Sequence, residues 1–572
     1  VPEADKVPEV KNPKEKASQP EVALTDPWSA AGQAEIIPRI LKGYQRYLVR
    51  RAQVEPLEVA EIFLSSMTRL YDPHSVYMAP DTEADFDMSM SLQFSGIGAR
   101  LSTKDSYSEI VSLIHGGPAE KDGRLKPGDQ IVAVAQAGEE PIDLTDMPLR
   151  KVVKHIRGKK GTTVFLTVKQ SATGQLAVID ITRGVVKLED QAAQSEIKSV
   201  PIAAANPGVG ANTVATGAGN GRALVISLPS FYADFKRRRM GFKDYKSSTR
   251  DIRELIEKAV AEGQLDGVVL DLRWNGGGAL DEAIGIAGLF FAEGPVVQVR
   301  DARGRVKKRY DPSADVAYGG PLVVLVDKSS ASASEIVAAA LQDYGRAVVI
   351  GDASTHGKGT VQSEIHLEDR LGRSREFRDG KRKPGAVKYT IAKFYRINGG
   401  STQLKGVVPD LILPSYTDHM DLGEAKLPNA LPWDEIQPAN YKKEGDVSHL
   451  LPELKERMGS RLAKDEEVQQ WMKSIRRYGE RRKMKEVPLE RKQRETLRRE
   501  DEEWGRKMRE AGVGGRRGKK GAKESQARDF VLDEALHVIA DINALQSIRE
   551  DVGGGPGKTA ATPGDELEDE LP

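Results

Sequence analysis

Residues 321–345 read Pro321-Leu-Val-Val-Leu-Val-Asp-Lys-Ser-Ser-Ala-Ser-Ala-Ser-Glu-Ile-Val-Ala-Ala-Ala-Leu-Gln-Asp-Tyr-Gly345. The opening apolar run has the length and composition of a strand that is buried within a sheet. The closing segment is rich in alanine, which has the highest helix propensity of the amino acids. A serine cluster joins the two segments, so the stretch predicts a buried strand that leads directly into a helix.

The same alternation continues on both sides of this stretch. Strands are expected at 223–228, 267–272 and 346–351, and helices at 249–262, 279–292 and 332–344. Strands that alternate with helices in this way are typical of an α/β sheet with helices packed on its faces. We therefore predict an α/β core over residues 222–415.

Residues 90–184 follow a different pattern. Short β-rich runs are separated there by Gly/Pro turns, and one helix is expected at 147–156. The loop Phe94-Ser-Gly-Ile-Gly-Ala-Arg-Leu101 places glycines just before a strand. The backbone N–H groups of such a loop can bind the free carboxylate of a peptide that adds to the sheet as an edge strand.

The remaining segments differ in composition. We expect a disordered leader at 1–27, a helical region at 28–89, a linker or insertion at 185–221, a charged helical region at 416–552 and a disordered acidic tail at 553–572. Basic residues outnumber acidic ones in 476–509, but charges of opposite sign are interleaved there and aromatic residues are few. This pattern favours a solvated helical face over nucleic-acid binding.

The composition excludes several classes of protein. The 572 residues include 86 Lys and Arg against 85 Asp and Glu, so the net charge selects no partner. The sequence contains no cysteine, which excludes disulfides, thiolate metal sites and cysteine nucleophiles. No run reaches the roughly 18 apolar residues of a membrane span, so no stable span is expected. Because the sequence begins at Val1 rather than Met, we expect that a signal or pro-region has been removed.

The serine cluster between the strand and the helix has two interpretations. Unpaired backbone N–H groups and the positive end of the helix dipole lie at such a position, and they could stabilise an oxyanion formed at a serine. Ser332 and Glu335 also match a capping box, and capping is the commoner role of a serine at a helix start. The pattern alone does not choose among Ser330, Ser332 and Ser334 as a nucleophile.

A serine nucleophile requires a base, and the sequence offers Lys358. No Gly-x-Ser-x-Gly elbow is present, and there are only eight histidines. Lys358 lies 26 residues after Ser332, and a right-handed return through the intervening helix and strand would bring its loop beside the serine. A lysine that is removed from water can lose its proton near neutral pH and act as a general base, although most loop lysines are simply solvated.

Two glycine-rich segments carry weaker signals. The run Gly276-Gly-Gly278 follows an expected strand and precedes a helix, so its N–H groups can face an anion or simply form a tight turn. The segment from Gly351 to Lys358 departs from a phosphate loop, because five residues rather than four separate Gly351 from Gly357. We therefore exclude nucleotide binding at this segment.

Taken together, these motifs resemble those of the tail-specific proteases, which are C-terminal processing peptidases that contain a PDZ domain. The matching segments occur in the family's order, at 96–99, 125–129, 271–278, 330–336, 357–362, 393–403 and 406–410. The segment Tyr71-Asp-Pro-His-Ser75 and the long charged C-terminal region resemble the larger periplasmic branch of the family. The loop at 351–357 is one residue longer than the family pattern.

The resemblance implies a role for each matching residue. Ser332 would be the nucleophile, Lys358 its general base and Gln362 the residue that orients the lysine. The backbone N–H groups of Gly277 and Ala333 would form the oxyanion hole. The implied fold is an α/β protease core of the ClpP/crotonase-like kind, with an inserted PDZ domain and helical N- and C-terminal regions.

The resemblance also implies substrates and surroundings. In the PDZ domain, Ile97, Gly98 and Ala99 would bind the carboxylate of an apolar C-terminal tail. The expected activity is that of a periplasmic serine endopeptidase that processes or degrades envelope proteins, alone or with an adaptor protein, without a metal or other cofactor. The rival interpretation is a catalytically inactive protein that uses its PDZ domain to bind peptides.

Overall fold

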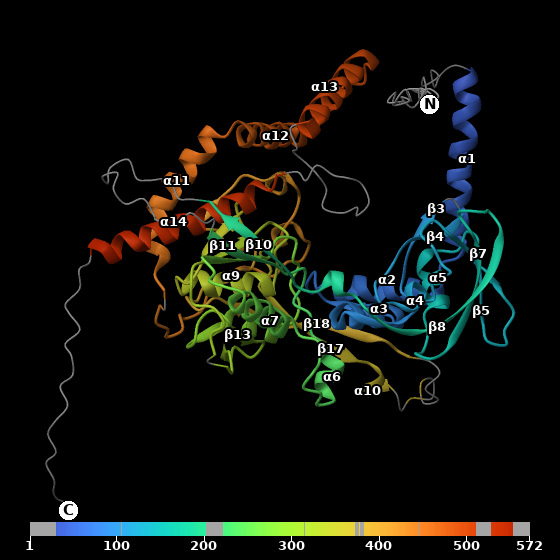
Figure 1. Ribbon diagram of the computed structural model, residues 1–572. Coiled ribbons are helices and arrows are strands. Elements are labelled where there is room, and N and C mark those ends of the chain that lie inside the picture. Colours follow the sequence, from blue (N-terminus) through green and yellow to red (C-terminus); the bar gives the residue numbers. More distant parts are fainter. Residues whose placement is uncertain are drawn as a thin grey trace, which may run out of the picture. The chain divides into compact units, whose positions relative to one another are not determined.

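A computed structural model describes residues 30–104, 106–201, 221–313, 315–371, 374, 377, 383–443, 445–510 and 528–552. The chain forms two compact units, whose elements are labelled in Figure 1. The first unit contains the chain up to Pro56 together with Gly96–Gly184, and the second contains Leu57–Ser95 together with the chain from Val185. The predicted leader at 1–27 and tail at 553–572 lie outside the described residues.

The first unit is built on an antiparallel sheet. Its strands follow the order β3-β4-β5-β7-β8, with bounds Ala99–Lys104, Tyr107–Leu113, Gln130–Gln136, Thr163–Lys169 and Leu176–Thr182, and β6 (Ile142–Asp143) pairs with β5. Buried and less buried residues alternate along β7, because successive side chains of a strand point to opposite faces. Val164, Leu166 and Val168 therefore all lie in the core of this unit.

Three helices belong to the same unit. Helix α5 (Leu149–Ile156) buries Val152 and Ile156 against the sheet, and α4 (Pro118–Asp122) is a single short turn. Helix α1 (Ala30–Ala52) also falls in this unit. The helical region predicted at 28–89 is therefore divided between the two units.

The second unit contains the predicted α/β core. Its six-stranded sheet has the order β10-β11-β12-β15-β16-β19, with bounds Gln194–Val200, Gly221–Ser227, Gly267–Asp271, Leu322–Val326, Val348–Gly351 and Leu411–Ile412. Neighbouring strands from β11 to β19 are parallel, whereas β10 runs antiparallel to β11. Every residue of β15 is buried, which explains its unbroken apolar run.

The helices expected between these strands are α7 (Ser248–Ala261), α8 (Leu280–Gly288) and α9 (Ala333–Asp343). The predicted alternation of strands and helices is thus confirmed, although α8 ends at Gly288 rather than at residue 292. Because β15 leads directly into the turn before α9, the serine cluster lies at the carboxyl end of a central strand. Binding sites in parallel α/β sheets commonly lie at this edge.

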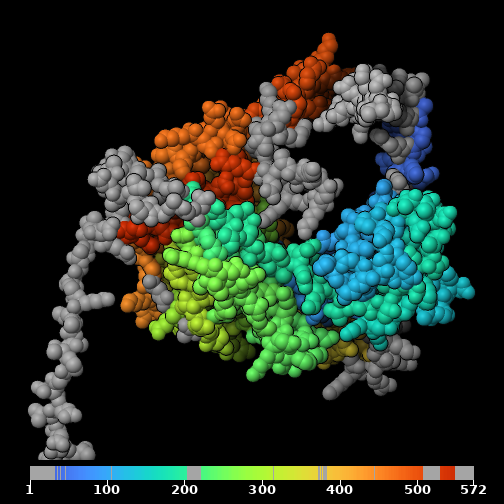
Figure 2. All heavy atoms as spheres, in the orientation of Figure 1, coloured from blue at the N-terminus to red at the C-terminus, as the bar shows by residue number. Residues whose placement is uncertain are grey.

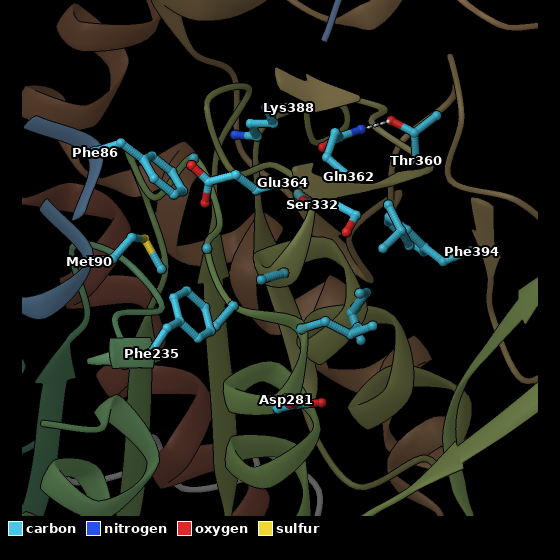
Figure 3. Close-up of a pocket in the computed structure, with 18 of the residues that line it drawn as sticks. Phe86, Met90, Phe235, Asp281, Ser332, Thr360, Gln362, Glu364, Lys388 and Phe394 are labelled. Atoms are coloured by element: carbon cyan, nitrogen blue, oxygen red, sulfur yellow. Dashed lines mark hydrogen bonds between the residues drawn. The ribbon is translucent and has the colours of Figure 1, made fainter. Parts of the chain in front are cut away.

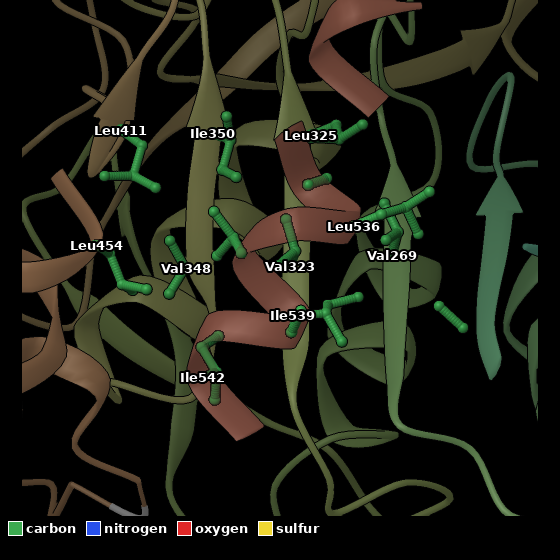
Figure 4. Packing of buried hydrophobic residues seen from close by; sticks show 14 of the residues in the cluster. Val269, Val323, Leu325, Val348, Ile350, Leu411, Leu454, Leu536, Ile539 and Ile542 are labelled. Atoms are coloured by element: carbon green, nitrogen blue, oxygen red, sulfur yellow. The ribbon is translucent and has the colours of Figure 1, made fainter. Parts of the chain in front are cut away.

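A helix from the far end of the chain covers one face of this sheet (Figure 4). In α14 (Phe530–Val552), the buried side chains include Leu536, Ile539 and Ile542, which pack with Val323 and Val348 of the sheet. A Cβ atom at Gly267 would lie 2.5 Å from Ile539, so the absence of a side chain there permits the close approach. Helix α14 is therefore part of the hydrophobic core of the second unit.

A second sheet forms one wall of the candidate site. Strand β18 (Ala386–Tyr395) pairs with β1 (Val76–Met78), β13 (Pro295–Asp301) and β17 (Thr360–His366), and β14 (Val306–Tyr310) extends the sheet beyond β13. Among the described strands, β17 pairs with β18 alone. One edge of β17 is therefore left without a strand partner.

The remaining helices surround the two sheets. They are α2 (Pro56–Thr68), α3 (Pro80–Ser91), α6 (Phe235–Arg239), α10 (Glu368–Leu371), α11 (Leu451–Lys464), α12 (Glu466–Lys483) and α13 (Arg491–Glu510), with 3-10 turns at Glu189–Gln191, Tyr416–His419, Glu424–Lys426 and Val447–Leu450. In Figure 2, the green segment that contains the basic helix α6 lies on the molecular surface. Of the helices in the described ranges, none combines the length and hydropathy that a membrane crossing requires.

The segment predicted as a linker, 185–221, is partly regular structure. Strand β9 (Gly184–Lys187) pairs with β2 (Gln93–Gly96), and β10 forms the edge of the main sheet. Most residues of β10 are exposed, and an edge strand tolerates polar side chains that a central strand would exclude. The polar sequence of β10 therefore led to the prediction of a linker where the structure has an edge strand. Residues 202–220 of the predicted insertion lie outside the described residues.

Candidate active site

The turn between β15 and α9 presents one of the three candidate serines to a cleft. Ser330 is fully buried, and its hydroxyl donates to the carbonyl of Leu272 at 2.8 Å. Ser334 is equally buried and donates to the carbonyl of Asn275 at 2.9 Å. Ser332, by contrast, lines the cleft that is drawn in Figure 3. Burial therefore distinguishes the serines that the sequence pattern left equivalent.

The backbone of Ser332 is strained. Its φ of 56° and ψ of −109° lie outside the regions that residues other than glycine favour. Strain of this kind persists where surrounding contacts hold it in place, and it is concentrated at functional sites. Here the N–H of Ser332 donates to the carboxylate of Glu335 at 2.7 Å, as the predicted capping box requires. The capping and catalytic interpretations are therefore compatible, because Glu335 caps the turn while Ser332 lines the cleft.

Glu335 joins this turn to the loop that carries Lys358. One oxygen, Oε2, accepts the N–H groups of Ser332 at 2.7 Å and Lys358 at 3.0 Å. The other, Oε1, accepts the Thr355 hydroxyl at 2.6 Å and the Gly357 N–H at 2.7 Å. Burial raises the pKa of Glu335 to about 7, although the hydrogen bonds oppose the shift. The sequence indicated Glu335 only as a helix cap, and its link to the lysine loop was missed.

Lys358 lines the same cleft as Ser332. Burial lowers the pKa of its amine to about 8, and the positive charge of Lys388 acts in the same direction. The carboxylates of Glu424 and Glu335 partly oppose this shift. Within the described residues no hydrogen bond joins the Lys358 amine to the Ser332 hydroxyl, although both residues line the cleft.

Gln362 lines the cleft, and among the described residues no hydrogen bond joins its side chain to the lysine amine. Its amide Nε2 donates to the hydroxyls of Thr360 at 2.9 Å, drawn in Figure 3, and Thr390 at 3.1 Å. Thr390 in turn donates to a carboxylate oxygen of Asp72 at 2.9 Å. Through these hydrogen bonds Gln362 connects β17 to β18. The role that the resemblance implies for it, orienting Lys358, stays a prediction.

The glycine turn before α8 lies directly against Ser332. A Cβ atom at Gly277 would lie 2.9 Å from Cβ of Ser332 and 3.1 Å from the backbone nitrogen of Ala333. The N–H of Gly277, however, already donates to Oδ1 of Asn275 at 2.8 Å. This acceptor, two residues earlier in the turn, engages the N–H group that the resemblance assigns to the oxyanion hole, and that assignment stays a prediction. The N–H of Ala333 makes no hydrogen bond within the described part of the chain.

The motif at 71–75 contributes a second polar group near the lysine. His74 Nε2 lies 2.8 Å from Glu424 Oε2, and Glu424 is fully buried. Burial alone would raise the pKa of Glu424, but the hydrogen bond and charge of His74 lower it below its usual value. Glu424 also accepts the Gln403 amide at 3.0 Å. Sequence reasoning identified the motif but not this carboxylate, which follows in the chain about 350 residues later.

The cleft has a volume of about 740 Å³. It is lined by α3, α6, the glycine turn, the start of α9, β17 and β18 (Figure 3). At one end, ligand atoms of Glu83, Glu364 and His366 lie within 4.8 Å of one another, the one such set in the described ranges that could hold a metal ion. His366 Nδ1 lies 2.7 Å from a carboxylate oxygen of Glu83, so these groups already form a hydrogen bond with each other.

In the first unit, Ile97, Gly98 and Ala99 occupy the turn that leads into edge strand β3. Gly98 has a φ of +79°, which favours glycine. The carbonyls of Ile97 and Gly98 accept the N–H groups of Ala119 and Ile114, each at 2.8 Å. Their own N–H groups donate no backbone hydrogen bond within the described residues. Among the described residues, these donors and the outer edge of β3 have no backbone partner, as binding of a peptide carboxylate requires.

Comparison with known families matches four stretches of the chain. Four family profiles match: Peptidase family S41 at 222–413, the PDZ domain at 85–169, the tail specific protease N-terminal domain at 14–81 and the C-terminal domain of tail specific protease at 417–544. The chain is 36% identical over 541 residues to the tail-specific protease of Haemophilus influenzae, covering 92% of this chain and 72% of that protein. The chain therefore belongs to the tail-specific proteases, which are PDZ-containing serine peptidases of family S41.

The chain is also similar to further proteins and to parts of solved structures. The chain is 31% identical over 349 residues to the carboxy-terminal processing protease CtpA of Bacillus subtilis, covering 61% of this chain and 62% of that protein. Among solved structures, the photosystem II D1 C-terminal processing protease matches with 24% identity and a TM-score of 0.33, covering 63% of this chain and 83% of that one. The PDZ domain of the carboxy-terminal protease from Vibrio cholerae, solved with a peptide, is 39% identical with a TM-score of 0.17, covering 17% of this chain and 100% of that one.

Proposed function

We propose that Ser332 and Lys358 form a catalytic dyad that hydrolyses proteins with apolar C-terminal tails. The observation that carries this proposal is the Glu335 carboxylate, whose Oε2 accepts the backbone N–H groups of both residues at the wall of one cleft. The lowered pKa of Lys358, about 8, supports the same role, because an appreciable fraction of the amine is neutral near physiological pH.

Catalysis would proceed through an acyl-enzyme. The Ser332 hydroxyl oxygen attacks the carbonyl carbon of the scissile bond, while its proton passes to the neutral amine of Lys358. When the tetrahedral intermediate collapses, Lys358 returns this proton to the leaving amine and an ester remains on Ser332. Water then attacks the ester, with Lys358 again accepting the proton, and the free serine and the carboxylic acid product are released.

The oxyanion would form at the N-terminus of α9. The N–H of Ala333 is available there, and the positive end of the helix dipole adds to its effect. A second donor from Gly277 requires that its N–H leaves Asn275 Oδ1, which it contacts at 2.8 Å. We infer that substrate binding displaces this internal hydrogen bond, because the oxyanion is the stronger acceptor.

Tail recognition would belong to the PDZ domain. The free N–H groups of the turn at Ile97 and Gly98, with the start of β3 at Ala99, support binding of a terminal carboxylate beside the unpaired edge of β3. The matches to both terminal domains of tail specific protease support assignment to the larger branch of the family. A periplasmic location, envelope substrates and an adaptor protein stay predictions from the resemblance. The ClpP/crotonase-like description of the core stays a prediction.

The proposal is tested by cleavage of an unfolded protein that ends in apolar residues. The complete chain is compared with Ser332→Ala and Lys358→Ala, and circular dichroism verifies that each variant is folded. We expect cleavage by the wild type and at least a 10³-fold loss in both variants, as for removal of a nucleophile or its base. Cleavage by folded Ser332→Ala would overturn the site. A folded wild type that binds the tail but never cuts would support the rival scaffold function.

A further inference from the structure

Three half-buried apolar side chains form a wall of the cleft that the catalytic proposal does not use. Phe86 and Met90 come from α3, and Phe235 is the first residue of α6. Figure 3 shows the three along one side of the cleft, with Ser332 and Phe394 on the other. Helix α3 buries none of its residues fully, so its apolar side chains cover the cleft rather than a core.

This wall is held in place before any substrate arrives. Gln93, just beyond the end of α3, donates its amide to Asp234 at 2.8 Å, and Asp234 accepts the N–H of Arg237 as the cap of α6. The amine of Lys388 lies 5.0 Å from the centre of the Phe86 ring, which fixes that ring against β18. A preformed apolar surface beside a nucleophile binds a side chain at little cost in ordering.

The geometry of β17 indicates how a peptide would reach this wall. Residues 360–364 of β17 are consecutive and all line the cleft, which means that the strand presents its edge to the cleft. That edge has no partner among the described strands. An extended peptide can therefore add to it, and its alternate side chains would then point to the same side.

The register of β17 sets the spacing. Oε2 of Glu335 accepts the backbone N–H groups of Ser332 and Lys358, and β17 begins two residues after Lys358, at Thr360. Further along the strand, Glu364 pairs with Lys388, whose amine lies 5.0 Å from the centre of the Phe86 ring. Four strand positions separate Thr360 from Glu364. We propose that Phe86, Met90 and Phe235 form a second subsite, which binds an apolar side chain two or four residues from the scissile residue. This inference rests on the proposed function, because it requires that the bond cut lies at Ser332.

The test uses internally quenched peptides with amidated C-termini, so that the PDZ domain has no carboxylate to bind. Leucine or serine is placed one to four residues from the scissile residue, counted in either direction along the peptide, and mass spectrometry verifies the bond that is cut. We expect kcat/KM to be about tenfold higher for leucine than for serine at one even-numbered position, as for burial of a few methylene groups. A preference at odd positions, or at none, would overturn the subsite.

Variants of the wall complete the test. In Met90→Gln and Phe235→Ala, we expect the leucine preference to fall below about twofold, mainly through KM. Circular dichroism verifies that each variant is folded. Phe242→Ala is the matched control, because Phe242 is an exposed phenylalanine that does not line the cleft. Preference retained in both wall variants would contradict the proposal.

The two proposals fail in distinguishable ways. If wild-type protein cuts no peptide, the proposed function fails, and the same peptides are then tested for binding to the Ser332→Ala chain by fluorescence anisotropy. Tighter binding of the leucine peptide, lost in Phe235→Ala, would still support the subsite. Equal binding of leucine and serine peptides would overturn it.

Discussion

The buried carboxylate of Glu335 accepts hydrogen bonds from the backbone N–H groups of Ser332 and Lys358, the two residues of the proposed catalytic dyad. We predict that Glu335→Gln lowers kcat/KM about 100-fold, because an amide nitrogen would face N–H donors and displace one of the two turns. Steady-state kinetics, with thermal unfolding to measure stability, checks this prediction. Glu368→Gln, at an exposed position, is the control. Equal kcat/KM in both variants would show that Glu335 has no positioning role.

The pH dependence of activity belongs to Lys358. The base must be neutral, and burial lowers the pKa of Lys358 to about 8, so the rate should rise with pH up to about 8 and then level off. Lys358→Arg should be inactive at every pH, because guanidinium keeps its proton. Measuring kcat/KM on one peptide from about pH 5 to 9 tests the assignment, and a flat wild-type profile would contradict it.

The candidate residues of the site were predictable where the motif is continuous in sequence. Local pattern left Ser330, Ser332 and Ser334 equivalent, and the resemblance to the family singled out Ser332 and Lys358, which line one cleft in the structure. The hydrogen bond between His74 and Glu424 could not be predicted, because no local pattern in either segment indicates a partner 350 residues away in the chain. The engagement of Gly277 by Asn275 also depends on side-chain geometry that no pattern encodes.

At the scale of elements, α14 is the clearest test of packing. Ile539 is fully buried against the main sheet. We predict that Ile539→Ala lowers the free energy of unfolding by about 2–5 kcal/mol, through lost burial and an unfilled cavity beside Gly267. Leu489→Ala is the control, because Leu489 is 93% exposed and should change stability by less than about 0.5 kcal/mol. Denaturant unfolding compares the two, and equal midpoints would refute the docking of α14.

Elements with strong periodicity or continuous apolar runs were predicted well. Strands β12 and β15 and helices α7 and α9 all lie within about two residues of their expected bounds. Strand β10 was missed because its polar residues lie at a sheet edge, where solvent rather than neighbouring strands meets them. Its pairing with β11 is a tertiary contact, which local polarity does not indicate.

At the scale of the whole molecule, tail binding and cleavage are assigned to different units. We predict that Gly98→Ala weakens binding of a peptide with an apolar C-terminus to the full Ser332→Ala chain about tenfold, because alanine disfavours the φ of +79°. Fluorescence anisotropy measures the affinity, and amidation of the peptide should weaken it similarly. Gly174→Ala, which alters another left-handed glycine of the same unit, is the control. Equal loss in both variants would contradict a specific role for Gly98.

The central claim is that Ser332 forms an acyl-enzyme with the help of Lys358. It is tested most directly by treating the full chain with a peptidyl phosphonate, an electrophile that bonds to an activated serine, and by locating the adduct by mass spectrometry. We predict one adduct, on Ser332, which is absent from Lys358→Arg at the same pH. An adduct on Ser330 or Ser334, or an adduct on Ser332 that forms as fast without Lys358, would contradict the account.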